Sequence, residues 1–406
     1  MARRRKLVSL YTGAGGLDIG LEAAGFDTSV AVEMDRDAVA TLRHNRPWPV
    51  IDRDIHSISS KEILEVAGLR PGEAHLLIGG PPCQPFSKSG YWARGDARRL
   101  DDPRASTLEA YLRVLRDIQP RVFLVENVPG LAYRNKDEGL QLLKTTVDSI
   151  NRAVGTSYTL SIALLRASDF GVPQDRERVF IVGHREGIAF SFPKPTHSPA
   201  TAGIPGTEPV HTAWDAIGDL EGADDPELRM TGKWADLLPS IPEGLNYLHH
   251  TDRGAGLPLF GWRRRYWSFL LKLSKTMPAW TITAQPGSAI GPFHWKNRRL
   301  SMRELARLQT FPDSYEVLGT RSAYQRQLGN AVPCALAELL GRCLIKQLLR
   351  GHAPSERLSL LPPRRTPVSP SEPAAAVPKR FRTLVGRHEP HPGTGKGYAA
   401  TSRAEM

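Results

Sequence analysis

Residues 7–24 read Leu-Val-Ser-Leu-Tyr-Thr-Gly-Ala-Gly-Gly-Leu-Asp-Ile-Gly-Leu-Glu-Ala-Ala. Leu7 to Tyr11 has the length and apolar character of a buried strand. After a glycine-rich turn, Leu17, Leu21 and Ala24 recur at a spacing that places them on one face of a helix. A strand that enters a glycine turn and then a helix is the opening unit of a sheet whose strands run parallel.

The alternation of short apolar runs with helical segments continues to about residue 185. Further strand-like runs lie at 28–32, 75–78, 121–125 and 179–182, and a helical pattern lies at 35–44. This alternation indicates an α/β fold with a doubly wound, mostly parallel sheet. We expect this domain to occupy residues 1–190.

The rest of the chain divides into stretches of different composition. Residues 191–312 are rich in proline, glycine and aromatic residues and hold six of the eight tryptophans, so we expect a second, smaller and irregular domain there. Helical periodicity returns at Val332 to Leu349, which indicates that residues 313–350 complete the first domain. Residues 351–406 hold nine prolines and scattered arginines, a composition that predicts a disordered basic tail.

The net charge of the 406-residue chain is +12, which favours a polyanionic partner such as nucleic acid. A basic tail on a neutral enzyme is the alternative. The three cysteines form no Cys-x-x-Cys pair, so we expect neither a disulfide framework nor a thiolate metal site, and a cytoplasmic, nucleoid-associated location fits. No apolar run approaches the roughly 20 residues of a membrane span.

A single cysteine stands between prolines in Pro82-Cys83-Gln84-Pro85, directly after the apolar run 75–78 and two glycines. A cysteine presented at the carboxyl end of a strand is suited to act as a nucleophile. The polar, glycine-containing segment that follows, as far as Arg104, is typical of an active-site lid. The alternative is a buried cysteine that only packs.

Two other strand ends carry charged residues. Glu126 ends the apolar run 121–125, and partial burial would raise its pKa and make it an acid or hydrogen-bond donor. Arg176 and Arg178 alternate along a strand-like segment and so share one face, from which guanidinium groups could hold a carbonyl oxygen or a phosphate. A sheet edge that is salt-bridged to the neighbouring acids is the alternative.

The glycine turn indicates a ligand at the first strand. Gly13, Gly15 and Gly16 let the backbone approach a bound molecule and direct helix N–H groups at it. Asp18 stands where the third glycine of the dinucleotide fingerprint would be, which disfavours NAD and leaves an adenosyl ligand open.

Two later strand ends could hold the rest of such a ligand. Glu33, at the end of the second strand, could accept both ribose hydroxyl groups. Asp54-Ile55 follows a third short apolar run and could bind an adenine amino group.

In their order and spacing these motifs resemble those of the DNA (cytosine-5)-methyltransferases over roughly residues 6–350. The matching segments are Tyr11-Thr-Gly-Ala-Gly-Gly16, Glu33-Met34-Asp35, Asp54-Ile55, Gly80-Pro-Pro-Cys-Gln-Pro-Phe-Ser87, Glu126-Asn-Val128, Gln174-Asp-Arg-Glu-Arg178, Arg303-Glu304 and Gln327-Leu-Gly-Asn-Ala-Val332. Any one of them could arise by chance, whereas the full ordered set is specific. The resemblance implies a Rossmann-like fold that depends on S-adenosyl-L-methionine, with double-stranded DNA as the partner.

The resemblance also implies a role for each motif. Cys83 would add to carbon 6 of a flipped-out cytosine, Glu126 would act on ring nitrogen 3, and Arg178 with Arg176 would hold the carbonyl at ring position 2. The cofactor would contact Tyr11, Gly13, Gly15, Gly16, Glu33, Met34, Asp54, Ile55, Pro82, Asn330 and Ala331. The DNA would contact Gln84, Ser87, Gln174 and Thr281, and residues 191–312 would recognise the target sequence.

The predicted function is therefore methylation of cytosine within a specific duplex sequence by a monomer, as the modification half of a bacterial restriction system with a cognate endonuclease as partner. Two alternatives stay open: a tRNA (cytosine-5)-methyltransferase and a non-enzymatic DNA-binding regulator. The long aromatic and basic variable region favours DNA over tRNA. The intact set Cys83, Glu126 and Arg178 disfavours a protein that only binds.

Overall fold

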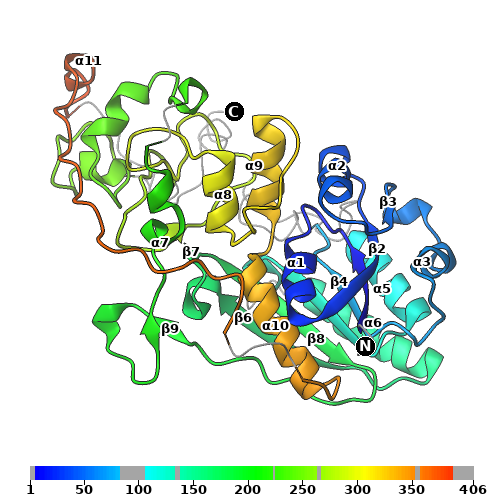
Figure 1. Cartoon of the computed structure of the whole chain (residues 1–406). Coiled ribbons are helices and arrows are strands. Elements are labelled where there is room, and N and C mark those ends of the chain that lie inside the picture. Colours follow the sequence, from blue (N-terminus) through cyan, green and yellow to red (C-terminus); the bar gives the residue numbers. More distant parts are fainter. Residues whose placement is uncertain are drawn as a thin grey trace, which may run out of the picture.

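A computed structural model of the chain describes residues 5–82, 106–132, 138–222, 225–262, 267–352 and 357–386 (Figure 1). Its centre is a seven-stranded sheet with the strand order β3-β2-β1-β4-β5-β8-β6. The strands are β1 (Arg5–Leu10), β2 (Phe26–Val32), β3 (Val50–Ile51), β4 (Leu76–Gly79), β5 (Val122–Asn127), β6 (Thr159–Arg166) and β8 (Glu177–His184).

The sheet is mixed and mostly parallel. Strands β1 to β5 run in one direction, and β8 runs antiparallel to both of its neighbours, β5 and β6. The chain moves outward from β1 through β2 to β3 and then returns to β4 on the other side of β1, so the strand order reverses between β1 and β4. The predicted α/β fold with a doubly wound, mostly parallel sheet is confirmed.

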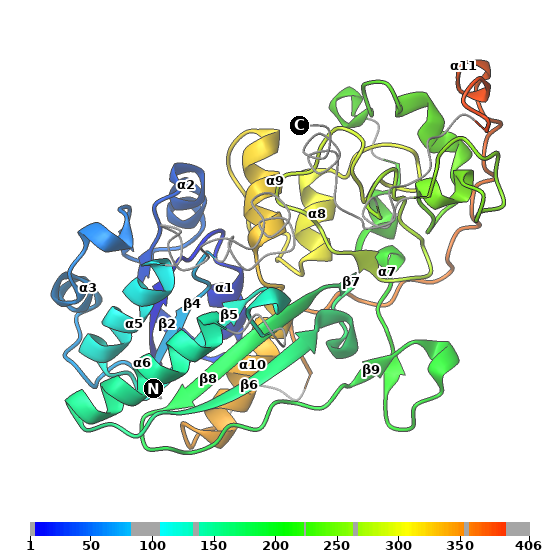
Figure 2. The ribbon, with the colours of Figure 1, turned by 180° about the vertical axis from the view of Figure 1, so that it is seen from behind.

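Helices cover both faces of the sheet (Figures 1 and 2). On one face, α1 (Gly16–Ala24) and α10 (Cys334–Gln347) share a core with the sheet to which Leu21 and Leu340 belong. On the other face, the helices α3 (Ser60–Ala67), α5 (Ser106–Ile118) and α6 (Glu138–Val154) bury residues such as Ile63 and Val147 in a second core. The strands are apolar on both sides because both faces are covered.

The second half of the chain is less regular. Its short helices and strands are β7 (Gln174–Asp175), β9 (His197–Ser198), β10 (Glu208–Pro209), α7 (Ala213–Ile217), β11 (Ala279–Trp280) and α8 (Met302–Leu308). Short 3-10 segments occur in both halves of the chain. In the first half they are Ile55–Ser57, Pro129–Ala132 and Ala167–Phe170, and in the second half Ala200–Ala202, Gly218–Leu220, Pro226–Leu228, Ala235–Ser240 and Tyr247–His250. A separate apolar core, to which Leu237 and Phe293 belong, stabilises this part of the protein.

Residues 313–350 return to the sheet. Helix α9 (Arg321–Asn330) contacts α2 (Arg36–Asn45), and α10 packs on α1. A third core combines Ile19 of α1 with Trp214, Trp295 and residues of α8. Side chains from both predicted domains share this core. The predicted domain boundaries, at residues 190/191 and 312/313, therefore stay a prediction.

One helical stretch in the described part of the chain, Arg321–Gln347, is long and apolar enough to cross a membrane by length and composition. Of its most apolar window, 78% is buried inside the protein. That burial is typical of a core helix.

The prediction of a disordered tail is wrong for residues 357–386. This segment lies along the protein surface, and Leu360, Leu361, Val377 and Phe381 each reach an existing apolar core. It ends in a short helix, α11 (Lys379–Arg382). A proline-rich segment cannot build a core of its own, but it can be ordered by apolar side chains that enter cores formed elsewhere. Residues 353–356 and 387–406 lie outside the described residues.

Candidate active site

The carboxyl ends of four parallel strands meet along one edge of the sheet. The glycine turn after β1, Glu33 after β2, Gly80 after β4 and Glu126 in β5 all lie there. In open α/β sheets, ligands bind at this edge beside the point where the strand order reverses. The fold therefore brings the predicted cofactor end and the predicted catalytic end together.

Glu126 and Arg178 form an ion pair at this edge. Strand β8 runs antiparallel to β5 with Glu126 opposite Phe180, so Arg178 lies diagonally across from Glu126. The Nε atom of Arg178 is 2.8 Å from Oε1 of Glu126, and the side chains are only 14% and 11% exposed. The sequence indicated both residues, and the structure gives each the other as partner.

Burial sets the protonation of this pair. Removal from water raises the pKa of Glu126 above its ordinary value, and the nearby charge of Arg178 opposes this rise. The same desolvation lowers the pKa of Arg178. A carboxyl group with a raised pKa, aligned by a guanidinium, can hold a proton and give it to a ring nitrogen.

The turn after β4 lies directly on this carboxyl group. A Cβ atom on Gly80 would lie 2.9 Å from Oε2 of Glu126, so a larger residue here would collide with the acid. The side-chain amide of Asn127 donates to the carbonyl of Pro81 at 3.3 Å and ties the turn to β5. Glycine at position 80 and asparagine at position 127 hence fix the direction in which the chain leaves β4.

Cys83, Gln84 and Ser87 lie outside the described residues. Pro82, the last described residue before them, is exposed, and its carbonyl accepts a hydrogen bond from Oγ1 of Thr107 at 3.2 Å. Cys83 is the third residue after Gly80, so an extended chain of about 3.6 Å per residue keeps the two Cα atoms within about 11 Å. The described chain therefore ends, at Pro82, two residues after the glycine that lies against the Glu126 carboxyl group.

Arg176 has different partners from Arg178. It is 1% exposed and its guanidinium donates to the backbone carbonyl groups of Ile282 at 3.3 Å and Gly329 at 2.7 Å. Burial, with a contribution from Arg178, lowers its pKa well below the ordinary value. Arg176, which lies between β7 and β8, therefore connects these strands to the segments around residues 282 and 329.

Gln174 and Thr281 also bind to the protein itself. The side chain of Gln174 is buried, donates to the carbonyl of Leu308 and accepts from the N–H of Ile282. Oγ1 of Thr281 donates to the carbonyl of Asp175 at 2.6 Å. Strand β11 pairs in parallel with β7 beside these contacts. These two of the four residues predicted to contact DNA thus fix the irregular second half of the chain to the edge of the sheet.

Glu33 is anchored by three backbone N–H groups. Gly13 donates to Oε2 at 2.7 Å, and Met34 and Asp35 both donate to Oε1 at 2.8 Å. Burial raises its pKa, while these hydrogen bonds oppose the rise. A carboxylate has about four acceptor positions, so the three N–H groups leave about one, on Oε2.

Four other predicted cofactor residues, Tyr11, Met34, Asp54 and Ile55, lie shortly after strands β1, β2 and β3. Tyr11 donates its hydroxyl to the carbonyl of Thr107 at 2.6 Å, and Met34 is 65% exposed. The side chain of Asp54 caps a 3-10 turn by accepting from the N–H of His56 at 3.0 Å, and Ile55 is buried.

Gly15, Gly16, Asn330 and Ala331 lie where α1 meets the end of α9. Gly15 has a left-handed φ of 78°, and a Cβ on Gly16 would lie 2.4 Å from the carbonyl oxygen of Val332. Asn330 is exposed and Ala331 is buried. The return segment therefore borders the glycine turn.

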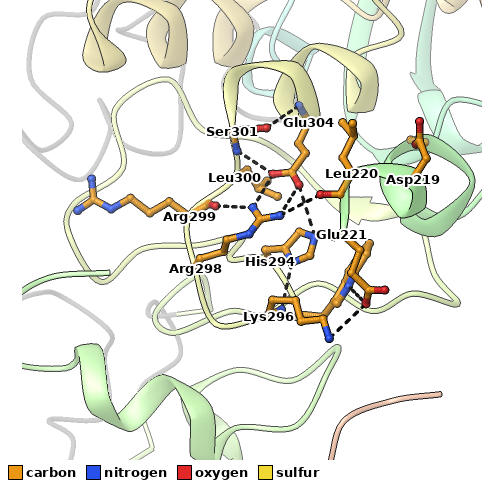
Figure 3. A network of polar contacts seen from close by, with 12 residues as sticks. Asp219, Leu220, Glu221, His294, Lys296, Arg298, Arg299, Leu300, Ser301 and Glu304 are labelled. Atoms are coloured by element: carbon orange, nitrogen blue, oxygen red, sulfur yellow. Dashed lines mark hydrogen bonds and ion pairs between the residues drawn. The ribbon is translucent and has the colours of Figure 1, made fainter. Parts of the chain in front are cut away.

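A polar network that no sequence pattern above predicted fixes α8 (Figure 3). Both terminal nitrogens of Arg298 donate to the Glu304 carboxylate, at 2.7 and 2.8 Å, and the same carboxylate accepts from the N–H of Ser301. His294 lies 3.5 Å from it. The spacing Ser301-x-x-Glu304 is a capping-box pattern that could have revealed the start of this helix.

A family model of C-5 cytosine-specific DNA methylases matches residues 5–346. Type II methyltransferase M.SacI from Streptomyces achromogenes is 39% identical over 369 residues, which cover 84% of this chain and 93% of that protein. Type II methyltransferase M1.HphI from Haemophilus parahaemolyticus is 32% identical over 348 residues, which cover 84% and 86%.

Solved structures show the same fold. The crystal structure of S. pombe Dnmt2 methyltransferase aligns with a TM-score of 0.55 at 18% sequence identity, over 86% of this chain and 99% of that chain. At this identity the likeness concerns the fold alone.

Proposed function

Because the chain belongs to the family of C-5 cytosine-specific DNA methylases, we propose that it transfers the methyl group of S-adenosyl-L-methionine to carbon 5 of a cytosine flipped out of a specific duplex DNA sequence. The observation that carries this proposal is the Glu126–Arg178 pair beside the turn that leads into Cys83. A ring base needs an acid, a carbonyl-binding cation and a nucleophile; Glu126 and Arg178 supply the first two at this sheet edge, and the third is proposed for Cys83, three residues along the chain from Gly80.

The residues at the cofactor end fit an adenosyl ligand. Gly13 has open space where a Cβ would lie, Glu33 retains one acceptor position, and Met34 offers an exposed apolar side chain. When bound there, S-adenosyl-L-methionine supplies an electrophilic methyl group.

In the proposed reaction the thiolate of Cys83 adds to carbon 6 of cytosine. Glu126 donates its proton to ring nitrogen 3, and Arg178 holds the oxygen at ring position 2, so the added electron pair is delocalised towards carbon 5. Carbon 5 then takes the methyl group and afterwards loses its proton to a base, which re-forms the ring double bond and expels Cys83 as a thiolate. Ring nitrogen 3 returns its proton to Glu126, so both groups are restored. Covalent addition is needed because carbon 5 of cytosine alone is a poor nucleophile.

The target base must leave the helix for this chemistry, at a cost of a few kcal/mol. Arginine and lysine side chains between residues 191 and 312 would grip phosphates and read base edges. Since the similar proteins are named Type II methyltransferases, we propose that this chain protects DNA from a cognate restriction endonuclease, which need not touch it.

Bisulfite sequencing of DNA from a methylation-free host that expresses the chain tests this function, with Cys83→Ala as the matched control. We expect protected cytosines at one short sequence motif, absent in the control. Labelling of tRNA without labelling of DNA would overturn the DNA substrate. Protein that is folded and binds DNA but labels neither nucleic acid would support a binding protein instead.

A further inference from the structure

Residues 357–386 form a strap that lies beyond the part of the chain matched by the family model, which ends at residue 346. Figure 1 shows this segment in orange and red. It runs from the vicinity of α10 past α7 to α11, at the far end of the irregular half (residues 191–312), which is called the recognition half below. It is fixed to the protein in four places.

The first anchor lies on the sheet half. The carboxylate of Glu338 in α10 is fully buried and accepts from the N–H of Ser359 at 2.8 Å and from the N–H of Leu360 at 3.1 Å. The hydroxyl of Ser359 donates to the same carboxylate at 2.9 Å. The start of the strap is therefore fixed to the helix that packs on α1.

The second anchor lies at α7. Asp215 accepts from the N–H of Arg365 at 2.9 Å and from the guanidinium of Arg364 at 3.1 Å. Nε of Arg365 donates to the Asp215 carbonyl at 2.8 Å. Asp215 is also the acid of the capping box that starts α7, so the strap and the helix share one carboxylate.

The third anchor supplies polar partners near two buried lysine side chains. Lys272 and Lys275 are 3% and 2% exposed, and a buried ammonium group is stable only with partners. Nζ of Lys275 donates to the strap carbonyl of Pro370 at 2.8 Å. Glu372 of the strap forms an ion pair with Lys296. Burial lowers the pKa of Lys272 to about 8, and the charges of Glu243 and of Glu372 oppose this decrease.

The fourth anchor lies in the core of the recognition half. Phe381 and Val377 are buried in the same core as Leu237 and Phe293. The Phe381 ring stacks on Trp234 with ring centroids 5.6 Å apart. The far end of the strap thus supplies part of the core on which this irregular half depends.

We propose that the strap is a positioning element for DNA recognition: it fixes the core around Leu237 and Phe293 relative to α10, and so sets where the target base arrives relative to Glu126. The third core already joins the two halves, and the four anchors add contacts that run from α10 to the core of Leu237 and Phe293. A small misplacement of a reacting group costs a large factor in rate. The inference rests on the proposed function, since its readout is DNA methylation.

The test uses the full chain with Val377→Ala and Phe381→Ala combined, and Phe381→Leu as the conservative variant. The matched control is Lys379→Gln with Arg382→Gln, two exposed residues of the same helix. The substrate is a duplex that carries the sequence found by bisulfite mapping. KM for DNA, kcat at saturating DNA and the Kd for S-adenosyl-L-methionine are measured for each.

We expect the alanine pair to raise KM for DNA at least tenfold, while kcat and the cofactor Kd stay within twofold; Phe381→Leu should recover most of the loss. An unchanged KM, or a cofactor Kd weakened as much as KM, would overturn the positioning role. An equal rise in KM for the glutamine pair would instead make the strap a direct DNA contact. Wild-type protein that methylates no DNA would refute the proposed function, an outcome distinct from all of these.

Discussion

Gly20 of α1 lies against the carbonyl group of Cys334 at the start of α10, so closely that a Cβ atom on residue 20 would be 2.2 Å from the carbonyl oxygen. The same added Cβ atom would lie 2.5 Å from the Cβ atom of Ala337, about one helical turn after Cys334. This contact joins the first helix of the chain to the last helix that packs on the sheet. It explains why the return segment can cover α1 so closely.

Gly20→Ala should therefore destabilise the protein, although alanine is the better helix former. Overpacking of a close contact costs about 1–3 kcal/mol, which urea unfolding would measure. Gly287→Ala is the control, because its Cβ would meet only Ile290, at 3.5 Å. Equal unfolding midpoints for the two variants would contradict this account of the helix contact.

Asp18 predicts a pH dependence of stability. It is fully buried and accepts hydrogen bonds from Ser9 at 3.0 Å and Thr28 at 3.2 Å. Burial raises its pKa from 3.8 to about 7. Since the folded-state pKa is the higher one, the carboxyl group favours folding at low pH, and this contribution is lost as pH rises from about 4 to 7.

Asp18→Asn cannot ionise and should escape this loss. The wild-type free energy of unfolding, relative to that of the variant, should fall by up to about 4 kcal/mol between pH 4 and pH 8. Urea unfolding at several pH values measures the difference. Parallel pH profiles for the two proteins would show that Asp18 does not titrate in this range.

The sequence predicted those features that depend on local pattern. Apolar runs predicted β1, β2, β4, β5 and β8, and helical spacing predicted α1 and α2. Glu126 and Glu33 follow from their places at strand ends. The different partners of Arg176 and Arg178 could not be predicted, because the carbonyl groups that Arg176 binds lie 106 and 153 residues away in the chain.

Burial of the aromatic residues was equally hidden. Trp295 is 1% exposed and Trp267 is 49% exposed, although both belong to the same irregular stretch without periodicity. The strap was missed for a related reason. Composition shows that a segment has no core of its own, but it does not show whether Phe381 enters a core formed by residues far away in the sequence.

Thr281→Val tests the connection between the segment that follows β11 and the strand β7 at the sheet edge. The change removes the donor to the Asp175 carbonyl and leaves that acceptor unpaired at a cost of about 1 kcal/mol. We expect KM for DNA to rise roughly fivefold, with the Kd for S-adenosyl-L-methionine unchanged. Thr281→Ser keeps the hydroxyl and should behave like the wild type in the same assay; a serine variant as impaired as the valine variant would refute this reading.

Glu126 should determine the alkaline limb of the activity profile. Its raised pKa means that the acid form persists above the pH at which an ordinary glutamate has lost its proton. As pH rises through that pKa, the proton for ring nitrogen 3 is lost and kcat/KM should fall.

Glu126→Gln should lower kcat by a factor of about 100 or more and remove this limb, because an amide does not titrate. Glu177→Gln, a change to a neighbouring acid that is 40% exposed and paired with Arg166, should leave both kcat and the pH profile as they are. If the alkaline limb survives in Glu126→Gln, another group carries it, and the proton transfer assigned to Glu126 is wrong.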